Sequence, residues 1–130
     1  MRIAELMTPN PVTVGPDASL ATVKSLMEAG KFRRVLVMEK EKLIAIVTER
    51  DVREHTGYLE LTKVTAAMRP NVLTVTPNQT AEDAARLMLE HKIGGLPVME
   101  GDRVVGILTS SDLLKAFLKV VAATEHIVDD

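Results

Sequence analysis

Two short polar stretches of this chain hold the residue types that could do chemistry. In each, a threonine follows an apolar run and an aspartate stands three positions later: Thr48 with Asp51, and Thr109 with Asp112. At the start of a helix, this pattern sets unpaired backbone N–H groups and the positive end of the helix dipole beside a hydroxyl, which favours phosphate. The aspartate can accept hydrogen bonds from the two vicinal hydroxyls of a ribose. Each turn is therefore predicted to contact a nucleotide.

The same spacing is that of a helix capping box. There the threonine side chain caps the first turn of the helix, and the acid reaches back to the threonine N–H. The cap alone explains either Thr-x-x-Asp sequence as well as a ligand does, and the two roles can coexist. The repetition of the pattern after two predicted buried strands favours nucleotide contact.

The two turns belong to a duplicated unit. An offset of 61 residues superimposes one turn on the other, and it also places Met7-Thr8-Pro9-Asn10 on Met68-Arg69-Pro70-Asn71 without a gap. Repetition of this length indicates a tandem supersecondary unit. We therefore divide the chain into repeat 1 (residues 1–57), a linker (58–67) and repeat 2 (68–130).

Each repeat is predicted to run strand, helix, strand, strand, helix. In repeat 1 we expect strands at 12–14, 35–38 and 43–47, a helix from Ser19 to Gly30, and a short helix from the Thr48 turn that ends at 55–57. In repeat 2 we expect strands at 72–75, 96–99 and 104–108, a helix capped by Thr80 and Asp83, and a long helix from the Thr109 turn. The later strands are apolar at successive positions, so we expect them to be buried on both faces in an α/β fold.

The composition argues against several classes of protein. The 130 residues include one Tyr, two Phe and no Trp, and the net charge is −2, which together disfavour a nucleic-acid-binding protein. Without cysteine there is no thiol catalysis, disulfide or zinc–thiolate site. We recognise no catalytic set, metal-ligand spacing or P-loop, and so predict no enzyme and no catalytic cofactor. No signal peptide or membrane-length apolar run is seen, and a cytoplasmic protein is expected.

The ordered motifs of the two repeats resemble a tandem pair of CBS (cystathionine-β-synthase) domains, also called a Bateman module. The residues that carry the resemblance are Met7-x-Pro9 with Val12-x-Val14, Met68-x-Pro70 with Leu73-x-Val75, Gly95 to Met99, and Gly106 to Leu113. The resemblance covers nearly the whole chain. It implies an α/β (α+β) fold of two β-α-β-β-α repeats about a pseudo-two-fold axis, with AMP, ADP, ATP or, in some members, S-adenosylmethionine in clefts between the repeats.

The resemblance also implies roles for particular residues. Thr48 and Thr109 would contact phosphate, and Asp51 and Asp112 would contact ribose hydroxyls. The base pocket would be formed by Val12, Val35, Ile46, Leu73, Ile93, Gly94, Gly95, Leu96, Pro97 and Ile107. Repeat 1 departs from the family pattern, because Ala45 replaces Gly106 and Leu36 replaces Pro97. The alanine is expected to narrow the approach of a ligand to the backbone.

Repeat 1 carries arginines where repeat 2 is small or neutral. Arg33, Arg34 and Arg50 correspond to Gly94, Gly95 and Ser111. Arginine forms forked hydrogen bonds to phosphate, so we predict that one of the three contacts a phosphate chain and favours a polyphosphate such as ATP. The alternative is solvated surface charge.

Together with these patterns, the resemblance implies a non-enzymatic regulatory module that senses adenine nucleotides and signals to a protein partner by conformational change. The last helix is apolar on more than one face, with Leu113, Leu114 and Phe117 among its residues, so a second face could bury against another subunit. Since CBS pairs commonly dimerise, the resemblance implies a homodimer; the alternative is that these residues pack within the chain. The alternative to a nucleotide-sensing module is a structural or adaptor protein with vestigial clefts that binds a partner enzyme or transporter. A nucleic-acid-binding module fits the basic residues of repeat 1 but not the composition of the whole chain.

Overall fold

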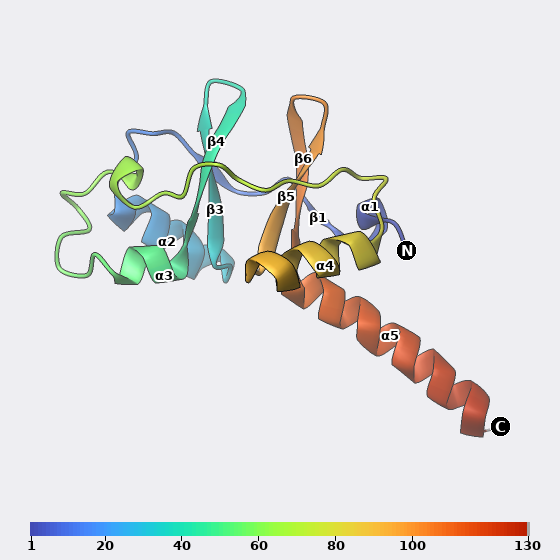
Figure 1. Ribbon diagram of the computed structural model, residues 1–130. Coiled ribbons are helices and arrows are strands. Elements are labelled where there is room, and N and C mark those ends of the chain that lie inside the picture. The colour runs from blue at the N-terminus through green and yellow to red at the C-terminus, as the bar shows by residue number, and fades with distance from the viewer. Residues whose placement is uncertain (130) are drawn as a thin grey trace. The chain divides into compact units, whose positions relative to one another are not determined.

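The computed structural model describes residues 1–129 (Figure 1). Asp130, the last residue of predicted repeat 2, lies outside the described residues, as do the side chains beyond Glu125. In chain order the elements are α1 (Ile3–Leu6), β1 (Thr8–Pro9), β2 (Thr13–Val14), α2 (Leu20–Gly30), β3 (Arg34–Glu39), β4 (Lys42–Thr48), α3 (Glu49–Arg53), the 3-10 helix η1 (Val64–Ala66), α4 (Ala81–His91), β5 (Gly95–Glu100), β6 (Arg103–Thr109) and α5 (Ser110–Asp129). The predicted α/β class is confirmed.

The chain folds into two compact units, and each contains residues of both sequence repeats. The middle unit is Pro11–Leu73, and the terminal unit combines Met1–Asn10 with Thr74–Asp130. The exchange follows from strand pairing. In the terminal unit, β1 from the start of the chain pairs with β6, with Thr8 opposite Ile107. In the middle unit, Arg69 forms the equivalent antiparallel bridge with Ile46. The Met-x-Pro segment of each repeat therefore completes the sheet of the other repeat.

The middle unit is a three-stranded sheet with helices packed on one face. The strand order is β2-β3-β4, with β2 parallel to β3 and β3 antiparallel to β4. The buried side chains of Leu20, Val23 and Met27 on α2 pack against those of the sheet in one hydrophobic cluster. The helix predicted to start at Ser19 is confirmed, and Ser19 is its cap, since its hydroxyl accepts a hydrogen bond from the Thr22 N–H at 3.1 Å. The helix ends at Gly30, and the C-cap residue after it is left-handed.

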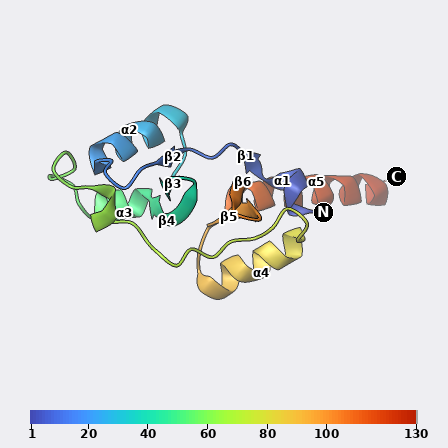
Figure 2. The same ribbon diagram turned by 90° about the horizontal axis from the view of Figure 1, so that it is seen from above.

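The terminal unit repeats this plan. Its strand order is β1-β6-β5, and Figure 2 shows β1 beside β6. The predicted capping box of Thr80 and Asp83 at the start of α4 is confirmed. The strand expected at 72–75 is shorter than predicted, because only Val75 pairs, in a parallel bridge with Val98. Two hydrogen bonds hold that bridge: the Val75 N–H donates to the Pro97 carbonyl and the Met99 N–H to the Val75 carbonyl.

Gly106 allows β1 to approach β6 closely, which corrects the expectation that this glycine makes room for a ligand. A Cβ at this position would lie 2.6 Å from the Met7 sulfur and 2.9 Å from the Thr8 carbonyl oxygen. The space beside Gly106 is therefore filled by the protein itself. The alanine at the matching position 45 is consequently a packing difference between the two units.

Candidate functional site

The turn between β4 and α3 is a closed capping box. The Thr48 N–H and hydroxyl each donate to Asp51 Oδ2 at 2.9 Å, and the Asp51 N–H donates to the Thr48 hydroxyl at 3.3 Å. The cap that we weighed against a ligand is thus present. Asp51 is only 3% exposed and is the one charged residue among the buried side chains in the part of the chain that the structure describes.

An arginine that we had not assigned to the site completes this turn. Arg69 Nε donates to Asp51 Oδ1 at 2.9 Å, and Arg69 Nη2 lies 2.7 Å from the same oxygen. Backbone pairing positions the arginine, because Arg69 and Ile46 exchange hydrogen bonds of 2.8 and 3.1 Å across the end of β4. Burial of the carboxyl raises the pKa of Asp51, but the hydrogen bonds from Arg69 and Thr48 outweigh it, so the pKa lies below its ordinary value.

The turn between β6 and α5 has the same box but a different neighbour. The Thr109 N–H and hydroxyl donate to Asp112 Oδ2 at 2.9 and 3.1 Å, and the Asp112 N–H donates to the Thr109 hydroxyl at 3.3 Å. The residue that corresponds to Arg69 is Thr8, whose hydroxyl lies 3.5 Å from Asp112 Oδ1. Asp112 is half-buried. Oδ1 of this carboxylate therefore has only one long hydrogen bond among the described residues.

Each turn forms the same hydrogen bond to the residue that directly precedes the neighbouring strand, β3 or β5. The Glu49 N–H donates to the Arg33 carbonyl at 2.8 Å, and the Ser110 N–H donates to the Gly94 carbonyl at 2.9 Å. In the strand register, Arg34 is opposite Thr48 and Gly95 is opposite Thr109. The residue beside the threonine is therefore an arginine in the middle unit and a glycine in the terminal unit.

The three predicted phosphate-contacting arginines have different surroundings. Arg33 and Arg50 are exposed and lie 3.6 Å from Glu49 and 3.9 Å from Glu54, so each has a carboxylate partner on the surface. Arg34 is half-buried, and no carboxylate lies within ion-pair distance of it among the described residues. Burial, and then the charge of Arg33, lower its pKa from the ordinary value. Arg34 is the most buried of the three arginines.

The predicted base-pocket residues divide between the hydrophobic cores and the opposite sheet faces. Val35 and Leu96 are fully buried in the cores, so their side chains are not available to a ligand. Val12 and Ile93 pack partly against the same cores. Ile46, Pro97 and Ile107 each stand between two core-facing strand residues, and therefore face away from the core. Gly94 and Gly95 lie at the entrance to β5, and Leu73 is 37% exposed in the middle unit.

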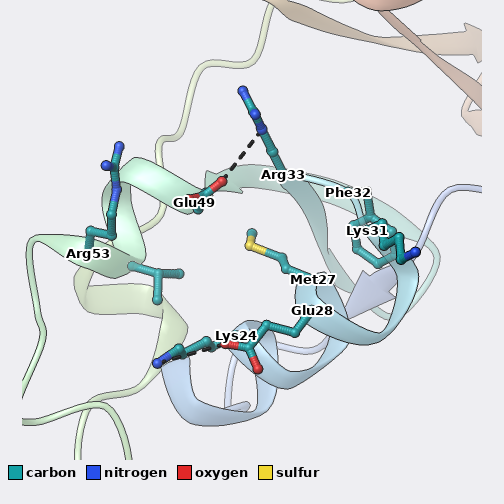
Figure 3. Close-up of a pocket in the computed structure, with 9 residues that line it drawn as sticks. Lys24, Met27, Glu28, Lys31, Phe32, Arg33, Glu49 and Arg53 are labelled. Carbon is teal, nitrogen blue, oxygen red and sulfur yellow. Dashed lines mark ion pairs between the residues drawn. The ribbon is translucent and has the colours of Figure 1, made fainter.

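A separate groove lies between α2 and α3 in the middle unit (Figure 3). Its volume is about 480 Å³, and Met27, Phe32 and Val52 provide its apolar surface. The charged lining residues are Lys24, Glu28, Lys31, Arg33, Glu49 and Arg53. Of the predicted site residues, only Arg33 reaches this groove. Neither Thr48 nor Asp51 lines the groove, although Glu49, which lies between them, does.

The terminal unit has the matching groove, between α4 and α5, with a volume of about 560 Å³. At the same offset of 61 residues, Lys24, Glu28 and Arg53 become Ala85, Leu89 and Leu114. Phe117 and Val120 extend its apolar lining along α5. The duplicated groove is thus charged in one unit and apolar in the other.

Among the described residues, no group of His, Cys, Asp or Glu is arranged to hold a metal ion. None of the helices that the structure describes combines the length and the apolar character needed to cross a membrane.

The comparison with known proteins agrees with these features. A sequence model of the CBS domain matches residues 3–57 and 64–119. The chain is 31% identical over 114 residues to CBS domain-containing protein YhcV of Bacillus subtilis (strain 168), covering 85% of this chain and 81% of that protein. It is 38% identical over 127 residues to inosine-5'-monophosphate dehydrogenase of Rhizobium tropici, covering 92% of this chain but 24% of that enzyme.

Solved structures agree as well. The structure of CBSX2 in complex with AMP matches with a TM-score of 0.81 at 28% identity, covering 92% of this chain and 97% of that one. The CBS domain model matches the chain twice, in agreement with its two strand–turn–helix motifs and two similar sheets. The chain therefore belongs to the CBS domain family and is a pair of CBS domains.

Proposed function

We propose that this CBS pair is a regulatory module that binds an adenine nucleotide at its strand-to-helix turns. The observation that carries the proposal is the turn at Thr109 and Asp112. The half-buried Asp112 carboxylate lies there, at the start of the 20-residue helix α5, and its Oδ1 accepts only one long hydrogen bond, from Thr8, among the described residues. An aspartate oxygen of this kind accepts ribose hydroxyls, and the start of a long helix favours phosphate. CBSX2, which is 28% identical, was solved in complex with AMP.

Binding would serve energy sensing through a change of conformation. A nucleotide shifts a conformational equilibrium only if it binds one arrangement more tightly than another. The chain would then act on a protein partner that recognises the favoured arrangement, in the cytoplasm. Catalysis is not part of this proposal.

Titration with nucleotides tests the proposal. AMP, ADP and ATP are added to the purified chain, and binding is measured by calorimetry and by the melting temperature. At about 100 times Kd, a ligand that binds only the folded state adds about 2.7 kcal/mol to the free energy of unfolding. GMP and S-adenosylmethionine test selectivity for the base and for the phosphate. Asp112→Ala is expected to weaken binding, while Asp102→Ala, at the exposed β5–β6 turn, is the matched control. The absence of any shift with every adenosyl ligand would contradict the proposal.

A second candidate is an adaptor that binds protein through an apolar face. It is favoured by the groove between α4 and α5, where Leu89, Leu114 and Phe117 are 81%, 62% and 60% exposed. Large exposed apolar surfaces are typical of interaction sites. For the predicted homodimer, we propose instead that the protein covering this groove is a second copy of the chain. The nucleotide titration distinguishes an adaptor from a nucleotide sensor, because only the sensor binds adenosyl ligands.

A further inference from the structure

The two capping boxes have the same internal hydrogen bonds, but the side chain that contacts the aspartate from outside the box differs. In both, the threonine N–H and hydroxyl donate to Oδ2 of the aspartate. The other oxygen, Oδ1, faces Arg69 in the middle unit and Thr8 in the terminal unit. These two residues occupy the same position of the Met-x-Pro motif. The structure thus allows a comparison of two carboxylates whose Oδ1 atoms have different side-chain neighbours.

The hydrogen-bonding capacity of the two carboxylates is therefore different. An ionised carboxylate has about four acceptor positions. At Asp51, Thr48 uses two of them, and Arg69 Nε and Nη2 stand at 2.9 and 2.7 Å from the remaining oxygen. At Asp112, the remaining oxygen has only the 3.5 Å contact with Thr8. A ribose could be accepted at Asp112 as the turn stands, whereas at Asp51 it would have to displace Arg69.

Arg69 has hydrogen-bond donors of its own that a ligand could contact. Its guanidinium carries five N–H donors, and only those on Nε and Nη2 face Asp51. The Arg69 side chain is 59% exposed, so its other donors remain accessible. Arg34 stands on the other side of the box, opposite Thr48 in the strand register. Two arginines thus flank the Thr48 box, where the Thr109 box has a threonine and a glycine.

We propose that Arg69 is a specificity-determining residue that separates the ligand preferences of the two turns. The Asp112 turn accepts a nucleoside through its ribose, with or without phosphate. At the Asp51 turn, Arg69 occupies the ribose-accepting oxygen and presents a cation, so binding there depends on a phosphate group. The inference rests on the proposed binding of adenine nucleotides.

Reciprocal substitutions test this directly. Arg69→Thr gives the Asp51 turn the neighbour that Asp112 has, and Thr8→Arg gives the Asp112 turn the neighbour that Asp51 has. Arg86→Thr is the control, because Arg86 is exposed on α4 and pairs only with Glu82 among the described residues. Calorimetry with adenosine, AMP and ATP reports the number of sites and the affinity for each variant. Thr8 is exposed, so Thr8→Arg keeps the test decisive if Arg69→Thr does not fold.

For the wild-type chain and Arg86→Thr, we expect one adenosine site and an additional site that only AMP or ATP fills. Arg69→Thr is expected to bind adenosine at two sites and to lose about tenfold or more in ATP affinity at the second, because a charge-assisted hydrogen bond to phosphate is removed. Thr8→Arg is expected to bind no adenosine. If nucleotides bind but the number of adenosine sites is the same in all variants, the inference is wrong while the proposed function stands. If no adenosyl ligand binds any variant, both are overturned.

Discussion

Arg69 and Asp51 belong to different sequence repeats, yet Arg69 Nε donates to Asp51 Oδ1 at 2.9 Å within the middle unit. The pair joins an exposed guanidinium to a carboxylate whose side chain is 4% exposed. It holds the segment after η1 against the turn between β4 and α3. The stability of this unit is therefore expected to depend on the pair.

Loss of the arginine should destabilise the chain. Arg69→Ala leaves the buried Asp51 carboxylate without its cation, and we expect the free energy of unfolding to fall by about 1–2 kcal/mol, since the arginine itself is largely solvated. Urea denaturation at neutral pH measures the change. Lys63→Ala is the control, because the Lys63–Asp17 pair is exposed on both sides and should contribute at most about 1 kcal/mol. Equal effects of the two substitutions would contradict a special role for Arg69.

The same pair predicts a dependence on acid pH. The pKa of Asp51 lies below its ordinary value, because the hydrogen bonds from Arg69 and Thr48 outweigh the effect of burial. A lowered pKa in the folded state stabilises the fold above the unfolded pKa of about 3.9, and this contribution is lost as the pH falls through the folded value. In Arg69→Ala burial remains and the cation is gone, so the pKa of Asp51 should rise and acid unfolding should begin at a higher pH.

Circular dichroism during acid titration, with NMR detection of the Asp51 carboxyl, measures both effects. An acid midpoint in Arg69→Ala that coincides with that of the wild-type chain would show that Arg69 does not set the pKa of Asp51.

Close packing at Gly106 predicts that a methyl group there is not tolerated. In Gly106→Ala the new Cβ would meet the Met7 sulfur at 2.6 Å and the Thr8 carbonyl oxygen at 2.9 Å. Overpacking of this kind costs about 1–3 kcal/mol. Gly15→Ala is the control, because a Cβ at Gly15 has no neighbour within 4 Å. Thermal unfolding compares the two variants.

A second substitution identifies the cause of that effect. Met7→Ala in the Gly106→Ala background should restore part of the lost stability, because the sulfur contact is removed while the contact with the Thr8 carbonyl remains. A Gly106→Ala variant as stable as the wild-type chain would contradict the packing argument.

The apolar groove between α4 and α5 predicts how the proposed homodimer is disrupted. Phe117→Glu places a charge on a surface that the partner copy would bury, so the dimer should dissociate to monomers at concentrations where the wild-type chain is dimeric. Light scattering after size-exclusion chromatography measures the molar mass. Leu61→Glu is the control, since Leu61 is 89% exposed in the middle unit. A wild-type chain that is monomeric throughout would contradict the homodimer itself.

Much of the local structure was predictable because it depends on neighbours in the sequence. The offset of 61 residues identified both Thr-x-x-Asp turns, and the three-residue spacing of a capping box placed their first hydrogen bonds. The caps at Ser19 and Thr80 likewise form between residues three apart in the sequence. Strands β3 to β6 were predicted from apolar residues at successive positions. Hydrogen-bond geometry at a helix start and burial of successive apolar residues are local enough to be read from sequence.

The tertiary structure decided which distant residues meet. Arg69 lies 18 residues from Asp51, and Thr8 lies 104 residues from Asp112, and only the exchange of the Met-x-Pro segments between the sheets brings each pair together. The same strand pairing places Met7 and Thr8 in the space beside Gly106. Because side chains alternate between the two faces of a strand, Val35 on β3 and Leu96 on β5 point into the hydrophobic cores. Such pairings depend on which sheet edge a segment completes. The difference between Arg69 and Thr8 can be linked to the two aspartates only once that edge is known.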